Sequence, residues 1–86
     1  MKILLIEQNR VFQAILVRAA AERSITLTSV ATAAEGIAAL AAGEFDFICI
    51  TRHLPDGDGL DLAGRIRDLP AHVFTPLILL TADSTP

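Results

Sequence analysis

The sequence is poor in cysteine, in positive charge and in long hydrophobic runs, and each scarcity excludes a class of protein. Cys49 is the only cysteine, so an intramolecular disulfide and a zinc site built from cysteines are both excluded, and a reducing compartment is expected. No apolar stretch approaches the roughly 20 residues of a membrane-spanning helix. The apolar run after Lys2 ends at Glu7, too early for a secretory signal. We therefore expect a cytoplasmic protein without membrane contact.

Basic residues are in the minority. Seven Lys and Arg stand against ten Asp and Glu, which gives a formal net charge of −3. A protein that binds nucleic acid neutralises phosphates with a basic surface, so DNA and RNA are not expected as direct partners. Hydrophobic residues make up 52% of the chain, too many for a disordered segment. Residues 1–86 are therefore expected to fold, as one small domain.

Hydrophobic periodicity divides the chain into alternating strands and helices. Short apolar or β-branched runs, typical of strands, cover residues 2–6, 25–30, 45–50 and 77–80. Stretches with apolar residues at helical spacing lie between them, from residue 10 to residue 22 or 23, at 33–42 and at about 59–67. Asn9, Thr32 and Asp58 are placed to cap the helices, and Gly43 to end the second one in a left-handed conformation. Gly64 costs the third helix about 1 kcal/mol against Ala, unless close packing requires it.

This alternation predicts an α/β fold with a parallel sheet, because each crossover between parallel strands carries its helix over a face of the sheet. Ligands bind such sheets beyond the carboxyl ends of the strands. The candidate site residues are those that end the strands: Glu7 and Gln8 after the first, Thr51 and Arg52 after the third, and Thr81 after the fourth. Cys49, within the third strand, is expected in the core.

Several motifs resemble the receiver domain of two-component response regulators. They are the acidic end of the first strand, residues 30–36 (VATAAEG), Asp46, residues 54–60 (LPDGDGL), and Thr75-Pro76 followed by residues 80–82 (LTA). The resemblance covers all 86 residues. It implies a flavodoxin-like fold with strand order 2-1-3-4 and helices on both faces. It also implies that the last helix, strand and helix of the family are missing from the domain.

The resemblance assigns roles to the candidate residues. The family's acidic pair falls on Glu7 and Gln8, its phosphate-accepting aspartate on Thr51, and its switch threonine on Thr81. Thr51 cannot replace a carboxylate nucleophile. Gln8 removes a hard anionic oxygen from a Mg²⁺ site, which leaves Glu7 as a remnant ligand position. We therefore expect a degenerate phosphorylation pocket without enzymatic activity or cofactor, where Mg²⁺ binds weakly or not at all. The lysine with which receivers hold the phosphate has no counterpart, since Lys2 is the only lysine.

Three hypotheses about function stay open. The first is a signalling module, not phosphorylated, whose partners are other signalling proteins or an attached output domain. The second is a receiver that is phosphorylated at a substitute residue, Thr51, Asp56 or Asp58, although the two aspartates are better explained as a turn residue and a helix cap. The third is an unrelated small enzyme, because a fold does not determine function.

The loop histidines and the last strand carry further expectations. His53 and His72 are expected to be solvated, and Glu7 is expected to pair with Arg52 or with the Thr51 hydroxyl. The apolar strand residues Leu77, Ile78, Leu79 and Leu80 would form a sheet edge with unpaired backbone groups. We therefore expect a homodimer that buries this strand, by edge pairing, face packing or domain swapping.

Overall fold

Four parallel strands form the centre of the structure, a computed structural model that describes residues 1–80. The strands are β1 (Lys2–Ile6), β2 (Thr26–Val30), β3 (Phe47–Thr51) and β6 (Leu77–Leu80), in the order β2-β1-β3-β6. All three pairings are parallel. The α/β fold and the predicted strand order 2-1-3-4 are thus confirmed, since β6 is the fourth of the predicted strands. The third strand lies slightly later in the chain than residues 45–50.

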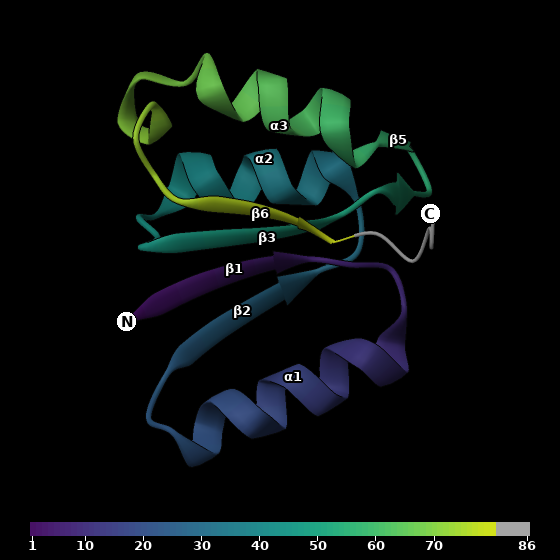
Figure 1. Cartoon of the computed structure of the whole chain (residues 1–86), viewed down its shortest axis with the longest axis vertical. Coiled ribbons are helices and arrows are strands. Elements are labelled where there is room, and N and C mark those ends of the chain that lie inside the picture. Colours follow the sequence, from purple (N-terminus) through teal and green to yellow (C-terminus); the bar gives the residue numbers. More distant parts are fainter. Residues whose placement is uncertain (81–86) are drawn as a thin grey trace, which may run out of the picture.

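The helices lie on both faces of the sheet (Figure 1). They are α1 (Arg10–Glu22), α2 (Ala33–Ala42) and α3 (Gly59–Arg67), with a single 3₁₀ turn, η1 (Pro70–His72), after α3. A small hairpin of β4 (His53–Leu54) and β5 (Gly57–Asp58) precedes α3. Each predicted cap accepts a hydrogen bond from a backbone N–H of its helix: Asn9 from Phe12, Thr32 from Glu35 and Asp58 from Leu60. The prediction for Gly43 was wrong, because its φ of −159° is extended.

The core lies between the sheet and the pair of helices α2 and α3. Alternate residues of β1 and β3 point to this side and are fully buried: Leu4, Ile6, Ile48 and Ile50. Leu40 of α2 and Leu62 and Ile66 of α3 pack on them. Leu77 and Leu79 of β6 are in register with Ile48 and Ile50 and pack against the same cluster. Half of the predicted interface strand therefore contributes to the core.

The opposite face is covered only in part, because α1 packs mainly against β2 and no other helix of residues 1–80 lies on that side (Figure 1). Leu5 of β1 is fully buried there. In the same register, Cys49 of β3 is half-buried and Ile78 of β6 is 45% exposed. The placement of Cys49 in the core was therefore wrong. We refer to Phe47, Cys49, Ile78 and Leu80 as the open half-face.

His72 is buried and not solvated as expected, with only 3% of its surface exposed. Pro70 begins the η1 turn, which brings the ring beside Ile37 and Leu40 of α2. The ring Nδ1 lies 3.1 Å from the Thr75 hydroxyl. Within residues 1–80 the ring Nε2 has no hydrogen-bond partner. The short turn, which the periodicity does not indicate, is the reason for the error.

No helix in the part of the chain that the structure describes is long and apolar enough to cross a membrane.

Candidate functional site

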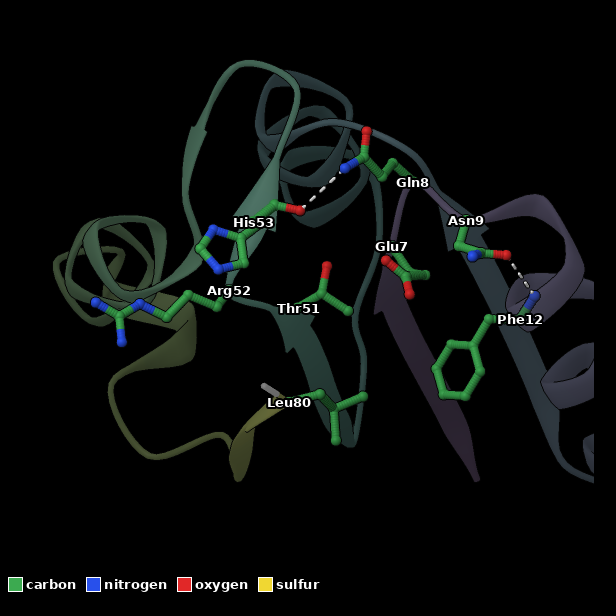
Figure 2. A pocket seen from close by; sticks show the side chains of 8 residues that line it. All are labelled: Glu7, Gln8, Asn9, Phe12, Thr51, Arg52, His53 and Leu80. Atoms are coloured by element: carbon green, nitrogen blue, oxygen red, sulfur yellow. Dashed lines mark hydrogen bonds between the residues drawn. The ribbon is translucent and has the colours of Figure 1, made fainter. Parts of the chain in front are cut away.

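A pocket of about 770 Å³ opens at the carboxyl ends of β1, β3 and β6. Its lining residues, drawn in Figure 2, are Glu7, Gln8, Asn9, Phe12, Thr51, Arg52, His53 and Leu80. The structure thus brings Thr51 together with Glu7 and Gln8, which lie 44 and 43 positions before it in the sequence. Thr81, the fourth predicted site residue, lies outside the described residues.

Strand register explains why these side chains meet. Ile6 is in register with Ile50, and Thr51 with Leu80. Glu7 and Thr51, the next residues after Ile6 and Ile50, therefore lie side by side, because the backbones of neighbouring strands are about 4.8 Å apart. The Thr51 hydroxyl donates a hydrogen bond to the Ile6 carbonyl at 3.2 Å. The N–H of Glu7 donates to the Val30 carbonyl at 2.9 Å. Both residues are therefore held by the backbone of an adjacent strand.

Gln13 of α1 fixes the turn between β1 and α1. Its side-chain amide donates to the carbonyl oxygens of Glu7 and Val30. The sequence analysis did not identify this role of Gln13. The pattern that could have indicated it is a polar residue among the apolar residues of the half-buried helix face. Phe12 was also missed as a pocket residue, because its spacing suits the core face of the helix equally well. The ring is 37% exposed.

Gly59 allows the start of α3 to lie directly against the end of β3. A Cβ at this position would lie 2.1 Å from the Thr51 carbonyl oxygen, closer than any real contact. The N–H of Gly59 donates to the Arg52 carbonyl at 2.6 Å. The glycine thus permits the close approach that fixes the backbone of Thr51 and Arg52 at the edge of the pocket.

Neither expected partner of Glu7 pairs with it. The Arg52 Nε lies 3.5 Å from an Asp58 carboxylate oxygen, and Figure 2 shows the guanidinium pointing away from Glu7. The Thr51 proton goes to the Ile6 carbonyl. The Glu7 carboxylate has no hydrogen bond or ion pair with any of the residues 1–80. The prediction failed because the hairpin of β4 and β5 places Asp58, the cap of α3, beside Arg52.

Asp56 and Asp58 are both engaged at helix N-termini. The Asp56 carboxylate, in the turn of the hairpin, accepts hydrogen bonds from the N–H groups of Ala33 (2.8 Å) and Ala34 (3.0 Å) at the start of α2. These bonds hold the pKa of Asp56 below its ordinary value. The pKa of Asp58 is lowered as well, first by the N–H of Leu60 and then by Arg52. Neither carboxylate lines the pocket.

The pocket therefore contains few groups suited to metal or acid–base chemistry. Glu7 supplies the one carboxylate among its lining residues. Among the described residues, no group of three or more His, Cys, Asp or Glu side chains could hold a metal ion. Gln8 is engaged with the hairpin, because its amide donates to the His53 carbonyl at 3.4 Å (Figure 2).

Two curated bacterial regulators match most of this chain. The transcriptional regulatory protein TcrA of Mycobacterium tuberculosis is 33% identical over 81 residues, which are 94% of this chain and 31% of TcrA. The transcriptional regulatory protein BasR of Escherichia coli is 34% identical over 85 residues, which are 99% of this chain and 37% of BasR. The chain thus spans about a third of the length of these relatives.

Solved receiver structures have the same fold. The chemotaxis response regulator CheY4 of Vibrio cholerae superposes with a TM-score of 0.93 at 20% identity, over 99% of this chain and 71% of its own. The signal receiver domain of an HD domain-containing protein from Pseudomonas fluorescens has a TM-score of 0.87 at 31% identity, over 96% of this chain and 60% of its own. The fold is therefore the flavodoxin-like fold of receivers. The family model of the response regulator receiver domain matches residues 3–86, and the chain belongs to this family of two-component signalling domains.

Proposed function

We propose that the chain is a receiver domain that acts through protein contacts and is not phosphorylated. One observation carries this proposal: Thr51 ends β3 in the pocket, and Glu7 is the one carboxylate among the lining residues. We assign Glu7, Gln8, Thr51 and Thr81 to the degenerate phosphorylation pocket. No enzymatic activity is assigned to the domain.

Phosphoryl transfer to a receiver requires a carboxylate nucleophile and a divalent cation that neutralises the developing charge. The Thr51 hydroxyl donates a hydrogen bond to the Ile6 carbonyl, and Glu7 is the one carboxylate among the residues that line the pocket with it. Glu7 would have to serve as base and metal ligand together. Mg²⁺ sites in proteins usually combine one or two carboxylates with the oxygens of a bound phosphate, and Glu7 alone provides a single carboxylate. We therefore propose that the pocket binds Mg²⁺ weakly or not at all.

Asp56 and Asp58 are poor substitutes for the missing aspartate. Each carboxylate accepts hydrogen bonds from the N-terminus of a helix, and both lie outside the pocket. To attack a phosphodonor, either carboxylate would have to give up hydrogen bonds that it accepts from backbone N–H groups at a helix start. The hypothesis of an unrelated enzyme likewise has no nucleophile paired with a base among the lining residues to support it.

We further propose that the partners are other signalling proteins or an attached output domain, and that the chain forms a homodimer through β6. β6 is the last strand in the sheet order of the described residues, and Ile78 is 45% exposed on the open half-face. The names of TcrA and BasR as transcriptional regulatory proteins support an output in transcription. With a net charge of −3, this domain itself is not proposed to bind DNA. A cytoplasmic location stays a prediction.

Intact-mass spectrometry after incubation with acetyl phosphate and Mg²⁺ tests the proposal. We expect no adduct on the unmodified chain. A stoichiometric, base-labile adduct of roughly 80 Da would contradict the proposal and point to an aspartyl phosphate. The matched control is the variant with Gln8→Asp and Thr51→Asp, which carries the full set of carboxylates and shows that the assay can detect transfer.

A further inference from the structure

The part of the pocket between β1 and β3 presents hydrogen-bond acceptors. A carboxylate such as that of Glu7 can only accept. The Thr51 hydroxyl donates its one hydrogen bond to the Ile6 carbonyl. Toward the pocket, the lone pairs of its oxygen can therefore only accept a hydrogen bond. Figure 2 shows the two side chains at the same cavity, with the Phe12 ring beside Glu7. A ligand at this point must therefore be a hydrogen-bond donor.

No lysine or arginine of residues 1–80 pairs with the negative charge of Glu7 inside the pocket. Arg52 is the one Lys or Arg among the lining residues, and its guanidinium pairs with Asp58 and points away. Glu7 is half-buried, and a carboxylate that is partly removed from water favours a cationic partner. Phosphate and other anions would be repelled. The ligand is therefore a cation as well as a donor.

Two of the other lining residues, Phe12 and Leu80, are apolar. Phe12 contributes a ring that is 37% exposed, and Leu80 continues the pocket toward Ile78 on the open half-face, because alternate residues of a strand share a face. An aromatic ring attracts a cation over its face. A lysine side chain combines a compact ammonium group with three donors and a four-carbon apolar stem. The ammonium group would suit the carboxylate of Glu7 and the hydroxyl of Thr51, and the stem would suit the apolar side chains of Phe12 and Leu80.

We propose that the pocket is a recognition site for the ammonium group of a lysine side chain on a protein partner. The ammonium group donates hydrogen bonds to Glu7 and Thr51, and the stem packs on Phe12 and Leu80. The choice of a protein partner rests on the proposed function, in which the domain acts through protein contacts. The ammonium chemistry rests on the pocket itself.

An NMR titration of the whole ¹⁵N-labelled chain tests this site. The probes are Nα-acetyl-lysine methylamide, its norleucine analogue, which keeps the stem and lacks the ammonium group, and n-butylamine, which lacks the peptide. We expect the lysine compound to shift the amide signals of Gln8, Phe12 and Thr51, and the norleucine compound to leave them unchanged. Equal shifts with norleucine would overturn the proposal. Tighter binding of n-butylamine than of the lysine compound would overturn the assignment to a protein side chain.

Variants locate the binding to the named side chains. Glu7→Gln is expected to weaken binding about tenfold, the usual effect of losing a charge-assisted hydrogen bond, and Phe12→Leu about threefold through loss of the ring. Glu44→Gln is the matched control, because Glu44 is an exposed carboxylate just before β3, at the other end of the strand, and it should leave binding unchanged. If Glu7→Gln does not fold, a salt titration of the unmodified chain replaces it: binding must weaken as ionic strength rises, and salt-independent shifts overturn the proposal.

The outcome is separable from that of the proposed function. A chain that shows no phosphoryl adduct and no lysine-dependent shifts retains the proposed function and refutes the lysine site. A chain that accepts a phosphoryl group refutes the proposed function, whatever the titration shows.

Discussion

Two adjacent residues of β6 allow the proposed dimer interface to be tested separately from the core. Ile78 lies on the open half-face and is 45% exposed, whereas Leu79 is in register with Ile50 and packs against the core cluster. A lysine at either position would disturb the proposed dimer for a different reason. Ile78→Lys should abolish dimerisation and leave the fold intact, and Leu79→Lys should lower the stability of the fold itself.

The magnitudes follow from the two environments. A domain of 86 residues has a free energy of unfolding of roughly 4–13 kcal/mol, at about 0.05–0.15 kcal/mol per residue. Leu79→Lys loses apolar contacts and brings an ammonium group to the core, which costs about 2–4 kcal/mol. Ile78→Lys costs the monomer less than about 1 kcal/mol, because a lysine stem can lie along the sheet while its charge stays in water.

Sedimentation velocity at micromolar concentration gives the oligomeric state, and urea denaturation gives the stability. The unmodified chain is expected to sediment as a dimer, and Ile78→Lys as a folded monomer of about 9.2 kDa. Stability is compared at a dilution where both chains are monomeric, since dimerisation itself stabilises the fold. A well-folded monomer for the unmodified chain, or an intact dimer for Ile78→Lys, would refute the reasoning.

Further predictions concern helix stability, acid sensitivity and the lost chemistry. Gly64→Ala should raise the free energy of unfolding by about 1 kcal/mol, measured by urea denaturation, because an added Cβ meets nothing within 4 Å; a loss of stability would show that the glycine is required. Because the pKa of Asp56 is lowered in the folded state, its hydrogen bonds to α2 stabilise the fold fully at any pH above the ordinary pKa of 3.8. This contribution is lost as the pH falls through the lowered folded-state pKa. Asp56→Asn should therefore unfold at a lower urea concentration at pH 7 and change less on acidification than the unmodified chain; equal acid titrations of the two would contradict this. The double variant Gln8→Asp with Thr51→Asp should regain Mg²⁺ binding, detected as Mg²⁺-dependent NMR shifts at Arg52, and unchanged spectra would show that the roles are assigned to the wrong positions.

Periodicity was sufficient to predict the alternation of strands and helices, because the strands are short and three of them are followed by a capped helix, whereas the strand order came from the resemblance to receivers. Asn9, Thr32 and Asp58 mark the helix starts by a local interaction that a sequence displays directly. The meeting of Glu7 and Thr51 could also be predicted, because parallel strands place their carboxyl ends at one edge of the sheet. Each of these inferences depends on backbone geometry and on residues close in sequence.

The errors concern side chains whose environment is set by distant residues. His72 lies in a segment that Pro70 marks as a loop, and its ring is buried beside residues of α2. Cys49 lies in an unbroken apolar run, yet it is half-buried because α1 lies over β2 and not over β3. The periodicity of a strand indicates which residues share a face, but it does not indicate whether another element covers that face.

The charge of the pocket shows how a local cap can determine a distant property. Asp58 is placed by its role at the start of α3, where it accepts from the N–H of Leu60 at 2.7 Å. The hairpin that carries it puts its second carboxylate oxygen 3.5 Å from Arg52, the one Lys or Arg among the residues that line the pocket. Arg52 is thereby drawn away from Glu7, which keeps its negative charge at the end of β1. The proposed preference of the pocket for a cationic ligand therefore depends on a helix cap, Asp58, which binds the arginine and does not itself line the pocket.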